Sequence, residues 1–278
     1  MLDAPAVTAY DLLGTDVAVM GLPLGGWADA PRAVRAASRR YAPWLVAAAR
    51  ASGVRVVDYG DVAVDGADIG ATFLRAHEHL ADIVAAGSTP LVLGGDALVT
   101  VPVLQVLSGK LRGRLGVVAF SPHLDLELET AHVASGRWTQ ALELGVLEPR
   151  NFVVIGERGA PDESRARSVF DALEARRFTV ADTGEAGMAA VAREALEAAT
   201  SGTEAVYISV DLRVVEGVED PVGIGASALS AALAVVAESR LAGADVCGVV
   251  PGGQTSGAAS LAARAATDIV LAVARQRG

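Results

Sequence analysis

Four residues near the ends of two apolar runs have side chains suited to metal binding or acid–base chemistry. His123 and Asp125 alternate in an extended segment after the run Leu115–Phe120, and Asp211 and Arg213 follow another apolar run. Two carboxylates and an imidazole are ordinary ligands of a divalent metal ion. The same groups also form an acid–base pair with an orienting partner. A third interpretation is that they cap loops and helix N-termini, which polar residues at strand ends commonly do.

The elements that must position these residues follow from an alternation of short apolar runs with longer amphipathic ones. The runs expected as strands are Val17–Gly21, Val54–Tyr59, Pro90–Leu93, Leu115–Phe120, Phe152–Ile155, Phe178–Ala181, Ala205–Val210 and Val246–Val250. The expected helices are Pro31–Ala51, Ala71–Ala86, Leu98–Leu107, Thr139–Leu147, Asp162–Arg176, Gly184–Ala199, Ser227–Leu241 and Ser256–Arg277. The pattern predicts a three-layer α/β/α sandwich with a mainly parallel sheet of about eight strands. Ligands bind at the carboxyl ends of such strands, where His123 and Asp211 are expected.

Composition limits the domain count, the partners and the compartment. No linker or composition break divides residues 1–278, which favours one domain over two. The net charge of −10 without a basic run excludes nucleic acid and anionic membranes as partners, and no apolar run is long enough to span a bilayer. The acidic segment Met1–Asp16 does not resemble a signal peptide, so we expect a cytoplasmic protein. A single cysteine, Cys247, excludes an intrachain disulfide and a thiolate zinc cluster.

Five segments of the chain resemble, in the right order, motifs of the ureohydrolase superfamily, the arginases and agmatinases. The segments are the opening strand and helix Val19–Pro23 and Pro31–Ser38, then Leu93–Thr100 with Gly-Gly-Asp, Val117–Asp125 ending in His-Leu-Asp, Tyr207–Arg213 with Ser-Val-Asp-Leu-Arg, and Asp245–Pro251. The resemblance runs from Val17 to about Pro251, nearly the whole chain. It implies an arginase-like fold. It also implies a homo-oligomer, a trimer or a hexamer, or a hetero-oligomer with an active paralogue.

The resemblance further implies a two-manganese site, but half of its ligands are replaced here. The family's six ligands, in the order His, Asp, His, Asp, Asp, Asp, fall on Ala97, Ser121, His123, Asp125, Asp211 and Arg213. Ala97 offers no ligand atom, Ser121 offers a neutral oxygen, and the permanent positive charge of Arg213 repels a divalent ion. We therefore expect no bound metal. The alternative is one manganese or zinc ion on the three remaining ligands.

The side chain of Arg213 is the substitution with the clearest electrostatic consequence. A guanidinium in place of a carboxylate supplies positive charge where a metal ion would have supplied it. We expect it to form a charge-assisted pair with Asp211 or Asp125, since bare carboxylates in a cleft are costly. Arg213 would in this way replace the metal electrostatically.

Positions that face the substrate in the family are altered as well. The family's late-strand glutamate falls on Gly248. The histidine-bearing loop after the second motif corresponds to Ala134–Gln140, where Trp138 or Thr139 stands in place of histidine. Ser121, Trp138, Thr139 and Gly248 are therefore the predicted substrate-facing positions.

Three functions remain open on this basis. The one we favour is a pseudoenzyme of the superfamily, a ligand-binding, regulatory or assembly protein. The second is a C–N hydrolase of a guanidino or amidino compound with a mononuclear metal site rebuilt on His123, Asp125 and Asp211. The third is a metal-free enzyme in which His123 acts as a base and Arg213 binds an anionic small molecule.

Overall fold

One eight-stranded sheet forms the centre of the molecule. The computed structural model describes residues 4–6, 11–40, 47, 51–112, 114–126, 136–159, 164–249 and 257–276. The strands are β1 (Val17–Leu22), β2 (Val56–Asp61), β3 (Thr89–Gly94), β4 (Leu115–Phe120), β5 (Phe152–Glu157), β6 (Arg176–Thr179), β7 (Ala205–Asp211) and β8 (Leu241–Cys247). Their order is β2-β1-β3-β8-β7-β4-β5-β6, and every neighbouring pair is parallel.

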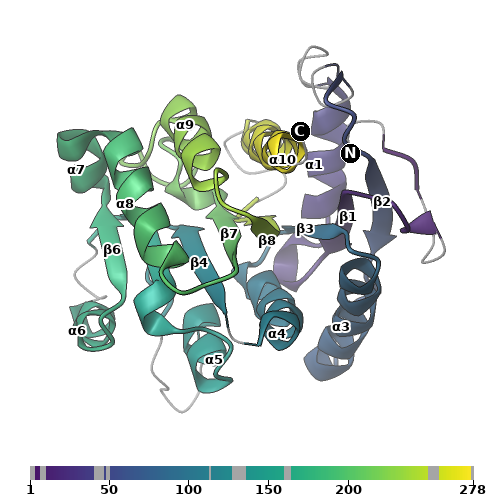
Figure 1. Cartoon of the computed structure of the whole chain (residues 1–278), viewed down its shortest axis with the longest axis horizontal. Coiled ribbons are helices and arrows are strands. Elements are labelled where there is room, and N and C mark those ends of the chain that lie inside the picture. The colour runs from purple at the N-terminus through teal and green to yellow at the C-terminus, as the bar shows by residue number, and fades with distance from the viewer. Residues whose placement is uncertain are drawn as a thin grey trace.

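Helices cover both faces of this sheet (Figure 1). One face carries α1 (Ala30–Arg40), α8 (Met188–Thr200), α9 (Ala226–Val236) and α10 (Ala258–Arg275). The other carries α3 (Ile69–Ala85), α4 (Thr100–Leu111), α5 (Arg137–Glu143) and α6 (Ser164–Ala172). Shorter helical segments among the described residues include α7 (Val180–Asp182), 3₁₀ turns at Gly25–Trp27, Ala97–Val99, Pro149–Asn151 and Leu212–Val214, and a π turn at Thr183–Gly187. The predicted three-layer α/β/α architecture is confirmed.

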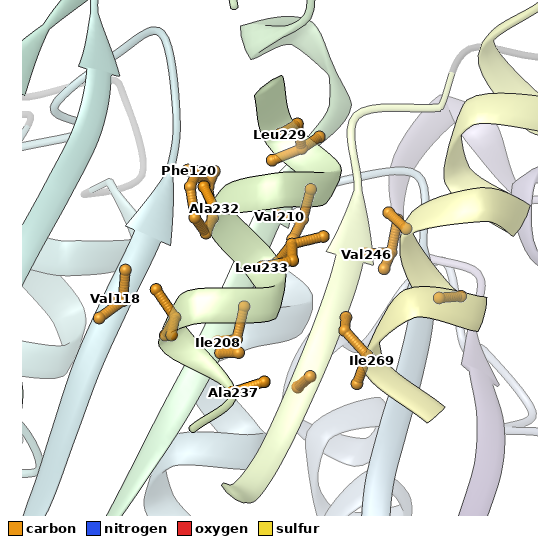
Figure 2. Packing of buried hydrophobic residues seen from close by; sticks show 14 of the residues in the cluster. Val118, Phe120, Ile208, Val210, Leu229, Ala232, Leu233, Ala237, Val246 and Ile269 are labelled. Carbon is orange, nitrogen blue, oxygen red and sulfur yellow. The ribbon is translucent and has the colours of Figure 1, made fainter. Parts of the chain in front are cut away.

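The strands are apolar on both faces because each face is buried under helices. In β4, Val118 and Phe120 belong to the core on the α8–α10 side, while Val117 and Ala119 belong to the opposite core. Figure 2 shows the first of these cores, in which Leu229, Ala232 and Leu233 of α9 and Ile269 of α10 lie over Val118, Phe120, Ile208, Val210 and Val246 of the sheet. Full burial of each large apolar side chain contributes roughly 1.5–3 kcal/mol, so these two cores stabilise the sheet that carries the site.

Sequence patterns misplaced the ends of several elements. The helix expected to reach Arg176 ends at Ala172, and β6 spans Arg176–Thr179 rather than Phe178–Ala181. Two further segments also differ. The last strand was expected at Val246–Val250, but β8 spans Leu241–Cys247, and the helix expected to reach Leu241 ends at Val236. The run Leu-Ala-Gly-Ala has little intrinsic strand preference, and its pairing with β7 determines its conformation. In the second segment, α8 begins at Met188 rather than near Gly184, after the π turn. Residues 41–46, 48–50, 162–163, 250, 256 and 277, which were expected in terminal parts of predicted elements, lie outside the described residues.

The carboxyl ends of β4, β7 and β8 bring the predicted site residues to one edge of the sheet. Phe120 pairs with Val210, and Asp211 pairs with Cys247. Ser121 and Gly248, which directly follow β4 and β8, therefore lie beside Asp211. Within the described ranges no helix is long and apolar enough to cross a membrane.

Candidate functional site

A buried guanidinium lies at the centre of this edge, and it belongs to Arg137, the first residue of α5. Arg137 is 2% exposed. Its Nε lies 2.9 Å from Asp125 Oδ2, an ion pair that is not aligned as a hydrogen bond. Its Nη2 donates to Ser121 Oγ at 3.1 Å and lies 3.9 Å from Asp211 Oδ2. Arg137 thus contacts three of the positions that correspond to metal ligands in the resemblance.

The remaining contacts of Arg137 come from the interior of the sheet and from its own helix. Nη1 donates to Ser209 Oγ at 3.2 Å and lies 3.7 Å from Cys247 Sγ. The guanidinium carbon lies 4.7 Å from the ring centroid of Trp138, a cation–π geometry. Trp138 is itself fully buried against Phe152, with ring centroids 4.6 Å apart. The orientation of Arg137 is therefore fixed on every side.

A second guanidinium, that of Arg213, is bound to Asp211. Arg213 Nε donates to both Asp211 oxygens at 3.0 Å, Nη2 donates to Oδ2 at 2.5 Å, and the backbone N–H donates to Oδ1 at 3.0 Å. Asp211 is fully buried and ends β7. This is one of the two pairings predicted for Arg213. Asp211 consequently lies between two guanidinium groups, Arg213 and Arg137.

These charges shift the pKa values of the two carboxylates in opposite directions. Burial opposes ionisation of Asp211, but the charge and hydrogen bonds of Arg213 and the charge of Arg137 outweigh it, and they hold the pKa of Asp211 below its usual value. Burial raises the pKa of Asp125, and the nearby charge of Asp211 adds to this effect; attraction by Arg137 and Arg213 only partly offsets it. For both arginines, the carboxylates outweigh burial and raise the guanidinium pKa, so both remain charged.

An outer group of ionisable side chains lies beside Arg213. His123 Nε2 lies 3.5 Å from Glu219 Oε2, and Arg158 Nη1 donates to the same oxygen at 2.7 Å. Arg213 Nη1 lies 3.8 Å from Glu219 Oε1. His123, Arg158 and Arg213 therefore surround the carboxylate of Glu219.

A second buried carboxylate, Asp245, lies beneath Arg137 in the sheet. It accepts hydrogen bonds from Thr100 Oγ1 at 2.8 Å, from Ser209 Oγ at 3.1 Å and from the Tyr207 hydroxyl. Burial raises the pKa of Asp245, and burial together with that carboxylate raises the pKa of Tyr207 well above its usual value. Since every one of these groups is fully buried, their hydrogen bonds are needed to offset the cost of removing them from water.

Sequence reasoning missed Arg137, Arg158, Glu219 and Asp245 as site residues. Asp245 carried a usable signal, because a carboxylate inside an apolar strand must have buried partners. For Arg137 the only signal was its place in the loop that corresponds to a histidine-bearing loop in the resemblance. Arg158 and Glu219 showed no pattern that sets them apart from surface charges.

The predicted substrate-facing positions lie in different surroundings. Ser121 is fully buried and accepts from Arg137, and its hydroxyl also donates to His123 O at 2.8 Å. Trp138 and Thr139 are 0% and 7% exposed, and Trp138 packs beneath Arg137 in the core. Their predicted contact with a substrate is not tested by this arrangement.

Gly248 has a backbone conformation and a close contact that both require glycine. Its φ is +72°, and a Cβ at this position would lie 2.1 Å from Asp211 Oδ1. The glutamate that the family places here is therefore incompatible with the observed position of Asp211.

At the position of the first lost ligand, Ala97 begins a 3₁₀ turn capped by Asp96, whose Oδ1 accepts from Leu98 N at 2.8 Å. Asp96 is therefore the N-cap of this turn.

The residues at this edge do not fit a two-manganese centre. Asp211 is already bound by Arg213, Ser121 accepts from Arg137, and Asp125 is paired with Arg137. Among the described residues, no group of three or more His, Cys, Asp or Glu side chains is arranged to hold a metal ion. Positive charge at this edge comes from side chains of the chain itself.

Comparison with known proteins identifies the family. The model of the arginase family matches residues 11–272. Guanidinopropionase of Pseudomonas aeruginosa is 30% identical over 224 residues, which are 75% of this chain and 68% of that protein. Mitochondrial agmatinase of Gallus gallus is 33% identical over 177 residues, which are 58% of this chain and only 50% of that protein. The chain belongs to the arginase family.

Solved structures agree with this assignment. A hypothetical agmatinase from Burkholderia thailandensis superposes with a TM-score of 0.81 at 26% identity, over 96% of this chain and 89% of that one. Proclavaminate amidino hydrolase from Streptomyces clavuligerus has a TM-score of 0.83 at 23% identity, over 99% and 96% of the two chains. At that identity the second likeness concerns the fold.

Proposed function

We propose that this chain is an arginase-family protein that does not perform manganese-dependent guanidine hydrolysis and acts as a binding protein for a small anionic molecule. One observation carries the proposal: the guanidinium of Arg137 is inserted among Asp125, Ser121 and Asp211. A divalent ion placed there would face a permanent positive charge at contact distance. Removal of Arg137 from the site would require a buried residue to move.

Arg213 supports the same conclusion at the neighbouring position. Its side chain binds both oxygens of Asp211, which stands at the position of a metal ligand of the family in the resemblance. The exposed surface of this edge is formed partly by His123, Arg158 and Arg213. The guanidinium groups of Arg158 and Arg213 there favour an anionic ligand and disfavour a guanidinium substrate.

The named relatives are enzymes, so a catalytic function is a second candidate for this chain. Guanidinopropionase and agmatinase carry enzyme names, and a further relative, from Homo sapiens, is named a guanidino acid hydrolase. The observation that favours retained catalysis is the contact between His123 Nε2 and Glu219, which is a possible base with an orienting carboxylate. A metal-free reaction on an anionic molecule is therefore the second candidate.

Metal content per chain, measured by elemental analysis, tests the proposal. The protein is purified with manganese and zinc available and is then dialysed. We expect well under one ion per chain and no urea release from agmatine, guanidinobutyrate or guanidinopropionate. A stoichiometric ion that is lost in Asp211→Ala would contradict the proposal. Activity that survives chelators and disappears in His123→Ala would support the second candidate instead.

We further propose a domain organisation, an assembly state and a compartment for this chain. Residues 1–278 form one domain around the single sheet. The chain assembles as a homo-oligomer, a trimer or a hexamer, or with an active paralogue, and it acts in the cytoplasm. Light scattering combined with size-exclusion chromatography measures whether the chain alone forms a homo-oligomer. A monomer would contradict the homo-oligomer.

A further inference from the structure

The carboxylate of Glu219 is the common partner of three side chains from different parts of the fold. Arg158 follows β5, His123 follows β4, and Arg213 follows β7. Their nearest nitrogens lie 2.7, 3.5 and 3.8 Å from its oxygens. We infer that Glu219 occupies a carboxylate-binding subsite, and that a small carboxylate ligand binds there by displacing it. This inference rests on the proposed binding function and specifies its ligand class.

The two arginines are held so that each directs one remaining nitrogen toward this subsite. Arg158 Nε donates to Val222 O at 3.0 Å and Nη2 donates to Arg213 O at 2.5 Å, while Nη1 is the nitrogen that reaches Glu219. Arg213 uses Nε and Nη2 for Asp211, and its Nη1 faces Glu219. A pair of donors fixed before a ligand arrives reduces the entropy lost on binding.

The loop that carries Glu219 is anchored independently of its carboxylate. Val215 and Ile224 form a β-bridge, Glu216 N donates to Ile224 O at 3.0 Å, and Gly217 N donates to Asp220 O at 2.8 Å. Displacement of Glu219 therefore requires rotation of one side chain rather than movement of the loop. That side chain is 39% exposed and can rotate into solvent.

The chemistry of the subsite selects the ligand. Glu219 shows that a carboxylate fits between Arg158 and Arg213, whose planar guanidinium groups suit planar oxyanions. A cationic guanidino group at the same place would meet two like charges. The expected ligand is thus a small carboxylic acid whose anionic end takes the position of the Glu219 carboxylate.

Succinate binding to the full-length protein, measured by calorimetry at constant ionic strength, tests this inference. Glu219→Gln removes the internal competitor while keeping the side-chain shape. The matched control is Glu216→Gln, which makes the same charge change at an exposed position of the same loop. Succinamide, with neutral amides in place of both carboxylates, is the control ligand. Circular dichroism verifies that each variant is folded.

We expect Glu219→Gln to bind succinate about fivefold more tightly than the wild type, a ratio that corresponds to about 1 kcal/mol, the upper range for a partly exposed ion pair. Glu216→Gln should bind as the wild type does, and succinamide should not bind. Equal affinity in Glu219→Gln and the wild type would overturn the inference. An equal gain in Glu216→Gln would do so too, because it would indicate a general charge effect. Stoichiometric manganese in the wild type would instead overturn the proposed function.

Discussion

Replacement of Arg137 by methionine should destabilise the protein by about 3 kcal/mol at pH 8. Methionine keeps the apolar stem against Trp138 but leaves Asp125 without its ion-pair partner. Removing one partner of a buried pair typically costs about 3–5 kcal/mol. We expect the lower value because the Asp125 side chain is 21% exposed and Asp211 retains Arg213. Urea denaturation followed by circular dichroism measures the free energy of unfolding.

The pH dependence of this loss follows from the pKa of Asp125, which burial already raises. Without Arg137 that pKa rises further. The folded variant then binds more protons than the unfolded chain, whose aspartate pKa is about 4. The contribution of Asp125 to the stability of the variant is therefore largest below the unfolded pKa and is lost as the pH rises through the folded pKa. The difference from the wild type should be smaller at pH 4.5 than at pH 8.

Two further variants separate this reasoning from a simple loss of packing. Asp125→Asn in the Arg137→Met background removes the unpaired charge and should recover about 1–2 kcal/mol. Arg177→Met is the matched control, because it takes one guanidinium from the buried Glu157 while Arg167 remains 3.2 Å away, and it should cost about 1 kcal/mol or less. A loss below about 1 kcal/mol in Arg137→Met, or an equal loss at both pH values, would refute the argument.

Three other outcomes are expected from the same site. Because the pKa of Asp211 is lowered, its ionised form stabilises the fold above the unfolded pKa of about 4, and this stabilisation is lost as the pH falls through the folded pKa. The loss of stability caused by Asp211→Asn, measured by urea denaturation, should therefore shrink below pH 4. A loss that stays constant with pH would be contrary evidence. Gly248→Ala should lose at least about 1 kcal/mol more than Gly217→Ala, since both have φ near +75° but only the first meets Asp211, so equal thermal shifts would contradict the clash. Tyr207→Phe should lose about 1–3 kcal/mol by leaving Asp245 short of a donor, and an unchanged urea midpoint would argue against that hydrogen bond.

The parts of the fold and site that could be predicted are those in which neighbours along the chain are also neighbours in space. The strand runs were visible because a parallel strand covered on both faces must be apolar throughout, as Leu115–Phe120 is. The pairing of Arg213 with Asp211 was predictable because the two residues are only two positions apart, just after a strand. The shift of β8 was not visible, since Leu241–Ala244 become a strand through pairing with β7.

The remaining site residues depend on how distant segments approach one another. Arg137 reaches Asp125 only because α5 begins against the carboxyl edge of the sheet. Glu219 meets His123 because the loop after β7 lies over the end of β4. Neither contact leaves a spacing or a periodicity in the sequence, and in both cases an ordinary surface charge would look the same.

The guanidinium groups of Arg137 and Arg213 are covalently part of the chain, and this has a thermodynamic consequence. A protein stabilised by a dissociable ion gains an amount that depends on the free ion concentration relative to the dissociation constant. Here Arg137 and Arg213 are present at a fixed one-to-one ratio with Asp125 and Asp211 in every molecule. Under the proposed function, the electrostatic balance of the site is set during synthesis and does not vary with the supply of metal around the folded protein.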